Sequence, residues 1–258
     1  MTQSKLTEKV PTSNSEPAYS GATARTDNWW VEPLLVAIVF TAFGIYATYR
    51  AFENQYFEFG PYLSPFYSPN MKEFFPDLPF SAALLILPFP LAFRATCYYY
   101  RKAYYRSYFA HPPGCAVTWF KRKGYTGEFD FPFNLQNLHR YAFYFAVPIV
   151  LILWYDALKT LWYDGGFHLS VLTLVMLANC ALLSGYTFGC HACRHLVGGH
   201  LDSFSCPENK HSYKKWQRVT ALNEKHQEWA WTSLISVAIT DIYIRMACTN
   251  PSLAFQLF

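Results

Sequence analysis

Five long apolar stretches dominate this sequence and restrict the folds that the chain can adopt. A bilayer core about 30 Å thick requires roughly 20 mainly apolar residues of α-helix to cross it. The stretches cover approximately residues 30–49, 80–100, 141–162, 169–190 and 229–247. They are too long for core strands, and they lack the alternation that marks a transmembrane β-barrel. The sequence therefore predicts an all-α, polytopic membrane protein, a bundle of five transmembrane helices.

The composition agrees with a membrane protein. Only 15% of the residues are charged, whereas soluble domains contain about 25%. The net charge of +4 is small, and we expect no nucleic-acid partner. Residues 1–27 are rich in Ser, Thr and Glu without an apolar run, which predicts a disordered tail rather than a signal peptide. Residues 28–258 are expected to form the five-helix anchor domain.

The basic residues indicate the orientation of the helices. Twelve Lys and Arg residues lie in or beside the loops that join the second span to the third and the fourth to the fifth, and three lie on the opposite side. The twelve are Arg101, Lys102, Arg106, Lys121, Arg122, Lys123, Arg140, Lys210, Lys214, Lys215, Arg218 and Lys225, and the three are Lys72, Lys159 and Arg245. Cytoplasmic loops are enriched in Lys and Arg. The bias predicts that both loops and the N-terminus are cytoplasmic.

Cysteines and histidines also gather toward the cytoplasmic side. The odd number of seven cysteines, most of them in cytoplasmic segments, argues against a disulfide framework. Cys97, His139, Cys190 and His226 lie near the cytoplasmic ends of four different predicted helices. A single Cys or His at such a place is more often a packing or solvated residue. Their convergence at one depth is how helix bundles build metal sites, and it predicts one here.

The segment Cys190-His191-Ala192-Cys193-Arg194-His195 is the densest group of candidate ligands. On a continuous helix, Cys190 and Cys193 share one face while His191 and His195 share another. The segment then supplies one or two ligands, unless the helix breaks there. His191, His195 and Cys193 are therefore alternates to the four residues above.

Ionisable residues inside the predicted spans are costly, and three of them are singled out here. Asp241 and Arg245 are spaced i,i+4 in the fifth span and are predicted to form a structural ion pair near the outer interface. Arg94, in the second span, lies nearer the predicted metal site and is a candidate for stabilising an anionic cofactor or a reduced quinone.

Two motifs resemble those of the cytochrome b-type membrane anchors of succinate dehydrogenase, respiratory complex II. Gln-Asn-Leu-His-Arg at 136–140 resembles the family's HR motif, and the segment 194–202, which begins Arg-His-Leu and ends in Asp, resembles its RHL…D motif. Their order on successive helices also agrees. The family's axial haem ligand lies seven residues before the second His, and Phe188 stands there in this chain. Phenylalanine cannot ligate iron.

The segments at 96–101 and 189–191 resemble instead the actinobacterial anchors that hold a membrane-embedded Rieske-type [2Fe-2S] cluster in place of haem. Such a cluster takes two thiolates on one iron and two imidazoles on the other. The resemblance implies the ligands Cys97, Cys190, His139 and His226, with His191, His195 and Cys193 as alternates. An anchor that binds haem b through pairs from His139, His191, His195 and His226 is the alternative.

The resemblance also implies a function for the chain. It would be a subunit of succinate dehydrogenase (succinate:quinone reductase) in the bacterial plasma membrane, without catalytic action on succinate itself. It would anchor the flavoprotein and iron–sulfur subunits, pass electrons to quinone, and assemble into a higher oligomer of the heterocomplex. A membrane transporter or channel, and a structural anchor without a cofactor, are the alternatives from other classes.

Three residues are candidates for the quinone site. Arg140 matches the family's quinone-site Arg, and Gln136 falls at a small polar position of the family pattern. Tyr105 is the third, with Tyr98 and Tyr104 as alternative donors of a proton or a hydrogen bond, although this tyrosine-rich segment also fits an interfacial aromatic belt. A positive or hydrogen-bonding group beside the quinone oxygen stabilises the charge that develops on reduction.

Overall fold

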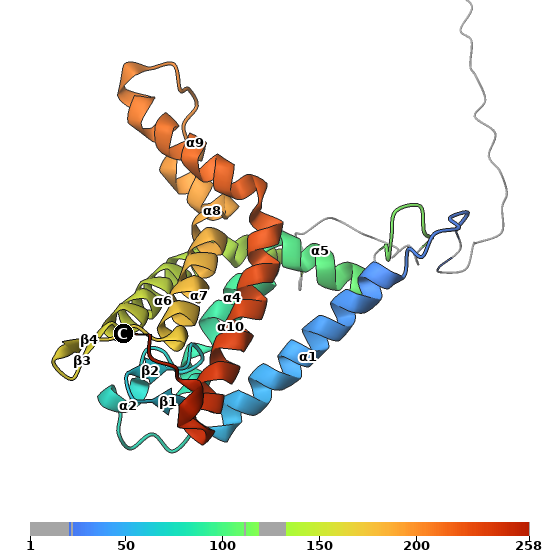
Figure 1. Ribbon diagram of the computed structural model, residues 1–258. Coiled ribbons are helices and arrows are strands. Elements are labelled where there is room, and N and C mark those ends of the chain that lie inside the picture. The colour runs from blue at the N-terminus through green and yellow to red at the C-terminus, as the bar shows by residue number, and fades with distance from the viewer. Residues whose placement is uncertain (1–20, 22, 111, 119–132, 258) are drawn as a thin grey trace, which may run out of the picture.

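The computed structural model describes residues 21, 23–110, 112–118 and 133–257, and these residues are mainly helical. Four long helices form the body: α1 (Val31–Glu53), α6 (His139–Lys159), α7 (Val171–Phe188) and α10 (His226–Thr249). Helix α7 contacts both α6 and α10, whereas α1 diverges from α10 toward the end of the molecule that carries α5 (Figure 1). At that end α5 contacts α1 and α10 and bridges the space between them.

Within the described ranges, three helices are long and apolar enough to cross a membrane. They are α1, α7 and the continuous helix of residues 134–159, which joins η1 (Phe133–Leu138) to α6. A shorter apolar helix covers Ala83–Ala95. Helix α10 has 24 residues but includes Glu228, Asp241 and Arg245. The prediction of a mainly helical membrane protein is therefore confirmed, with three candidate spanning helices in the described part of the chain.

The second apolar stretch is not one helix over residues 80–100, so that prediction is wrong. It contains α3 (Ala83–Ile86), α4 (Pro88–Ala95) and the start of α5 (Tyr98–Ser107). Backbone hydrogen bonds through Leu87 join α3 to α4, but the chain turns at Cys97, whose ψ of 133° is extended. The Thr96 hydroxyl donates to the Ala92 carbonyl oxygen at 2.7 Å. Such side-chain bonds to the backbone compete with helix continuation, and here they accompany the bend.

The fourth stretch agrees with a helix to within two residues at each end. Helix α7 stops at Phe188, Cys190 is extended (ψ 159°), and α8 (His191–Arg194) begins after it. Gly189 stands at the break, where a Cβ atom would lie 2.5 Å from the Gly185 carbonyl oxygen. The helix therefore breaks at the segment 190–195, so the sharing of faces expected on a continuous helix does not apply. Cys190 belongs to the turn between two helices.

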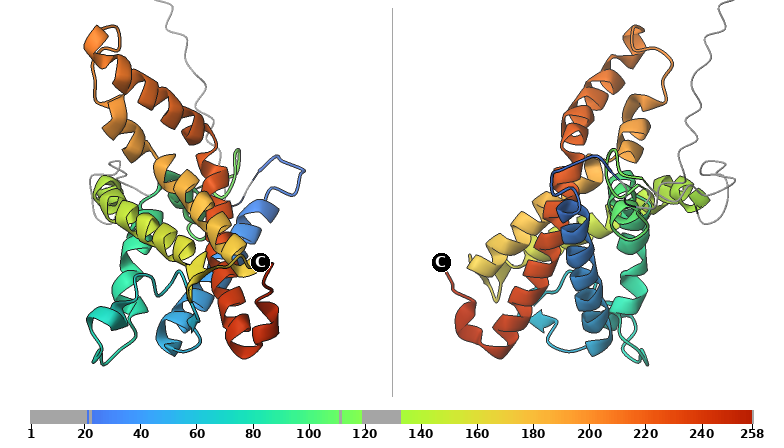
Figure 2. Two further views of the ribbon diagram at one scale, coloured as in Figure 1. Left: turned by 60° about the vertical axis from the view of Figure 1, so that its left-hand side comes forward. Right: turned by 90° about the vertical axis from the view of Figure 1, so that its right-hand side faces the viewer.

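Beyond the break, the chain forms a helical projection that extends past the bundle (Figure 2). It comprises α8, the π-helical η2 (His195–Gly199), η3 (Pro207–Asn209) and α9 (Lys210–Glu224), which packs back against η2 and α8. The Arg194 guanidinium lies 4.5 Å from the Trp216 ring centroid and donates to the Thr220 hydroxyl at 3.1 Å. These contacts fasten the two arms of the projection together.

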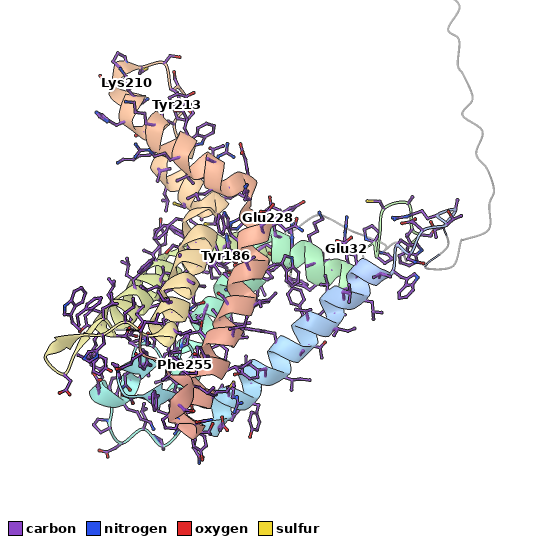
Figure 3. All side chains as sticks on the ribbon, viewed as in Figure 1. Glu32, Tyr186, Lys210, Tyr213, Glu228 and Phe255 are labelled. Atoms are coloured by element: carbon purple, nitrogen blue, oxygen red, sulfur yellow. The ribbon has the colours of Figure 1, made fainter. Side chains whose placement is uncertain are left out.

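The tip of this projection carries exposed basic residues. Lys210 lies there together with Tyr213, far from Tyr186 in the bundle (Figure 3). Lys214, Lys215 and Arg218 are exposed along α9 as well. The basic residues 121–123 of the other predicted cytoplasmic loop lie outside the described residues. Residues 1–20 and 22 of the predicted tail do so too, whereas Thr23 donates from its hydroxyl to the Ala116 carbonyl oxygen at 2.7 Å.

A close contact joins the last turn of α7 to the first turn of α10. A Cβ atom on Gly185 would lie 2.8 Å from the Trp229 ring, so only glycine permits this approach of the indole. A buried cluster next to this contact includes Cys97, Cys190 and Cys193. The thiols that precede α5 and α8, and the thiol of Cys193 in α8, thus lie in one part of the core.

Short hairpins and turns occupy the opposite end of the bundle. They are β1 (Glu58–Phe59) with β2 (Tyr62–Leu63), β3 (Trp162–Tyr163) with β4 (Gly166–Phe167), α2 (Met71–Phe74) and η4 (Pro251–Leu253). The predicted ion pair is confirmed, because Arg245 Nε lies 2.8 Å from Asp241 Oδ2. Arg245 also binds Glu53 at 2.7 Å. This end therefore holds α1 and α10 together through charges, and the predicted ligands Cys97, His139, Cys190 and His226 lie toward the other end.

Candidate functional site

A pocket of about 200 Å³ lies where the α4–α5 bend meets the first turns of α6 and α10 and the start of α8. It contains three of the four predicted metal ligands, Cys97, His139 and His226, and the alternate His191. The complete lining is Thr96, Cys97, Tyr98, Tyr99, Arg101, Gln136, Asn137, His139, His191 and His226. We call it the Cys/His pocket. Residues separated by up to 130 positions in the sequence thus meet at one place.

Cys97 and His226 are two predicted ligands that contact each other in this pocket. Cys97 Sγ lies 3.7 Å from His226 Nε2, and the two residues are 1% and 2% exposed. The bend at Cys97 and the start of α10 at His226 bring them together. The Tyr186 ring stacks on the His226 imidazole with centroids 5.1 Å apart and planes 10° apart. A thiol and an imidazole therefore face each other in a nearly dry environment.

His139 lies at the start of α6 on another wall of the pocket. Its Nδ1 is 2.9 Å from the Thr96 hydroxyl oxygen. The Phe93 ring stacks on the imidazole with centroids 4.8 Å apart and planes 5° apart. An aromatic ring and a hydroxyl from the end of α4 thus hold the orientation of this imidazole.

Cys190 is fully buried and belongs to the same core cluster as Cys97, although it is not part of the pocket lining. Its Sγ accepts a hydrogen bond from the Cys193 backbone N–H at 3.4 Å. Cys193 is buried beside it, and burial raises the pKa of the Cys193 thiol. His195 is exposed, away from the pocket, and its ring lies 5.9 Å from that of His200.

The candidate donors do not form a compact group. Among residues 21, 23–110, 112–118 and 133–257, no three His, Cys, Asp or Glu side chains lie close enough to hold one metal ion. The thiols and imidazoles are instead spread around the pocket and the adjoining core.

A second, larger pocket of about 780 Å³ adjoins the first. It lies between α4, α5 and the start of α6, and all but a few of its lining residues are apolar or aromatic. Gln136 and Tyr105, both predicted for the quinone site, line it together with Tyr104. Arg140, the third candidate, is exposed and lines neither pocket. We call this second cavity the apolar pocket.

Thr96 and Gln136 line both pockets and so mark their boundary. Gln136 Nε2 donates to the Tyr104 hydroxyl oxygen at 3.0 Å, and that hydroxyl donates to the Ala95 carbonyl oxygen at 3.0 Å. Burial raises the pKa of Tyr104, which keeps its hydroxyl protonated. Gln136 Oε1 is buried without a hydrogen-bond partner among the described residues. A buried amide oxygen without a partner among the described residues thus lies at the boundary.

Several contributors to the site did not stand out in the sequence. Phe93 and Thr96 end α4, and their roles depend on a bend that the sequence does not signal. The sequence does give a signal for Tyr186 near the site, because this residue lies four positions before Cys190 in the same apolar stretch. Arg94, a candidate from the sequence for stabilising an anionic cofactor or a reduced quinone, lies near the Cys/His pocket. Its guanidinium is 4.8 Å from the Tyr186 ring centroid and donates to the Ser233 hydroxyl at 3.2 Å.

Comparison with known proteins gives two matches and one negative result. A family model described as "Actinobacterial succinate dehydrogenase subunit SdhC" matches residues 31–250. A solved chain from the Mycobacterium smegmatis Sdh1 complex in the apo form is 42% identical, with a TM-score of 0.85. The similarity covers 92% of this chain and 94% of that one. No curated protein matches the sequence. The chain belongs to the family of actinobacterial succinate dehydrogenase SdhC subunits, the membrane subunits of that enzyme.

Proposed function

We propose that the chain carries electrons from a succinate-oxidising flavoprotein and an iron–sulfur subunit, through an embedded Rieske-type [2Fe-2S] centre, to quinone. The chain would anchor these two hydrophilic subunits on the cytoplasmic face of a bacterial plasma membrane. The observation that carries the proposal is the pairing of two adjoining pockets. One gathers the Cys97 thiol and three imidazoles, with the Cys190 thiol in the adjoining core, and the other is large, apolar and bordered by hydrogen-bonding groups.

Five membrane spans are part of this proposal. The helix Ala83–Ala95 and α10 would join the three candidate spans as the second and fifth. The exposed Lys and Arg residues of α9 project from the end of the bundle that holds the Cys/His pocket. By the positive-inside rule this end faces the cytoplasm, together with the N-terminus.

The residues around the Cys/His pocket suit a binuclear iron–sulfur centre. Cys97 and Cys190 would supply the thiolates and His139 and His226 the imidazoles, with His191 as the nearest alternate. When bound, the centre accepts and releases one electron at a potential that the neutral imidazoles raise relative to four thiolates. Because Cys97 and His226 would bind different irons, their 3.7 Å contact must open to admit the centre.

The sequence favours this centre over haem b, because Phe188 stands where the haem-binding anchors have their axial ligand.

The apolar pocket is the proposed quinone site. Its apolar and aromatic walls suit a ring with an isoprenoid tail, and its polar groups lie at the boundary with the Cys/His pocket. The Tyr104 proton is held by Ala95, so Tyr104 accepts from Gln136 and fixes the orientation of its amide. Gln136 Oε1 is therefore free to accept a hydrogen bond from the hydroxyl of the reduced quinone. Tyr105 lines the same wall.

The test is spectroscopy on the purified complex with all its subunits. Reduction with succinate or a stronger reductant is expected to give a rhombic Rieske-like EPR signal that disappears in His139→Ala and His226→Ala variants. Loss of the signal in His191→Ala and His195→Ala variants instead would reassign the ligands. A sharp reduced α-band of a b-type cytochrome, without that EPR signal, would contradict the proposal.

A further inference from the structure

Thr96 occupies the bend between α4 and α5 and lines both the Cys/His pocket and the apolar pocket. Its hydroxyl oxygen lies 2.7 Å from the Ala92 carbonyl oxygen and 2.9 Å from His139 Nδ1. These two short contacts determine which atom holds which proton.

A carbonyl oxygen can only accept a hydrogen bond. Two oxygens 2.7 Å apart need a proton between them, so the Thr96 hydroxyl proton points to Ala92. The Thr96 oxygen can then only accept from His139, which requires the proton of that imidazole on Nδ1. The neutral ring is left with its electron pair on Nε2.

We propose that Thr96 is a positioning residue that holds His139 as the Nδ1–H tautomer and so presents Nε2 as the metal-binding nitrogen. This inference rests on the proposed function, because it assigns His139 to the iron–sulfur centre. Ligating histidines generally donate their other ring N–H to such a partner, which orients the ring and raises its basicity. Thr96 performs this role at the wall that separates the centre from the quinone site.

The second imidazole has a different environment. His226 Nε2 faces Cys97 Sγ, whereas its Nδ1 is buried without a hydrogen-bond partner in the described part of the chain. The two histidines are therefore unequal, and the hydroxyl of Thr96 acts on His139 alone. Removing this hydroxyl is expected to change the signals of one ligand imidazole and leave those of the other.

The test compares Thr96→Val with Thr96→Ser in the intact complex. Valine matches the shape of threonine but lacks the hydroxyl, and serine keeps it. The measurements are the midpoint potential of the centre, the nitrogen hyperfine couplings of the ligand imidazoles by pulsed EPR, and iron retention against a chelator. In the Val variant we expect a higher potential, because a less basic imidazole stabilises the oxidised centre less. We also expect altered couplings for one nitrogen and roughly tenfold or greater weakening of iron retention.

The Ser variant is expected to match the wild type in all three measurements. Equal potentials and couplings in wild type and Thr96→Val, with the centre present in both, would overturn this inference and leave the proposed function intact. Loss of the centre in both variants would also overturn it, because the hydroxyl would not be the cause. A wild-type complex without the centre would overturn the proposed function as well. Should Thr96→Val fail to assemble, Thr96→Ala gives the same comparison without the branched methyl groups.

Discussion

Cys97 and Cys190 occupy equivalent places in the backbone. Each is an extended residue directly before a helix, α5 for Cys97 and α8 for Cys190, with ψ values of 133° and 159°. Backbone N–H groups at a helix start can donate to the side chain that precedes the helix. The Cys193 N–H that points at Cys190 Sγ is one example. Breaks in two apolar stretches thus deliver two thiols to one part of the core.

Replacing Cys97 tests this placement. Cys97→Ser is expected to abolish the rhombic EPR signal of the complex, because a serine hydroxyl does not replace a thiolate ligand of an iron–sulfur centre. Cys206→Ser is the matched control, since Cys206 is exposed on the projection, and it should leave the signal unchanged. Equal signals from both variants would remove Cys97 from the ligand set.

Gln136 provides a separate test at the quinone site. Gln136→Leu keeps the size of the side chain but removes the free acceptor, which is worth about 1–1.5 kcal/mol for one hydrogen bond. We expect quinone reduction to lose roughly tenfold in kcat/KM, with the EPR signal of the centre unchanged. The control is Arg140→Gln, which changes an exposed residue outside the pocket lining. A larger loss of kcat/KM in Arg140→Gln than in Gln136→Leu would contradict this assignment and place Arg140 in the quinone site.

The length of the apolar stretches predicts where the long helices lie, but it does not predict the breaks at Cys97 and Gly189. The predicted boundaries 30–49, 141–162 and 229–247 agree with α1, α6 and α10 to within a few residues, because burial in lipid demands continuous apolar helix. The bend at Cys97 has no sequence signal, since Tyr98–Tyr100 continue the apolar run through it. Gly189 is a readable signal for the second break, because glycine is common just past a helix end. The role of Thr96 depends on the first bend and was therefore missed.

The contact between α7 and α10 depends on the absence of a side chain at Gly185. In Gly185→Ala the new methyl group would meet the Trp229 ring at 2.8 Å, and the two helices must separate. Overpacking of this kind costs about 1–3 kcal/mol. We expect a lower thermal unfolding temperature of the complex and a weaker EPR signal, because Tyr186 and His226 lie beside this contact.

Gly44→Ala is the matched control for that substitution. Gly44 lies in α1 with nothing within 4 Å of its added Cβ, and alanine is the better helix former by up to about 1 kcal/mol. Its unfolding temperature is expected to be unchanged or higher. A lower value for Gly44→Ala than for Gly185→Ala would contradict the packing argument.

At the scale of the whole molecule, the charges and the pockets point to one orientation in the membrane. The projection of α8 and α9 would lie in the cytoplasm, close to the site that receives electrons, and the β3–β4 hairpin would lie outside. The test is labelling with a membrane-impermeant maleimide in a chain with Cys115 and Cys248 replaced by Ser. Cys206 should react with the maleimide only in inverted vesicles, which expose the cytoplasmic side. A cysteine introduced by Asp164→Cys, at the exposed turn of β3–β4, should react only in intact cells, which expose the outer side. The reverse labelling pattern would contradict this orientation and place α8 and α9 outside the cell.

The central claim is that this chain itself holds an iron–sulfur centre. The most direct measurement is the content of iron and acid-labile sulfide that stays with the chain after the hydrophilic subunits are removed from the purified complex. The account predicts about two iron atoms and two sulfides per chain, as the [2Fe-2S] formula requires. A chain that retains neither iron nor sulfide, from a complex that reduces quinone at its full rate, would contradict it.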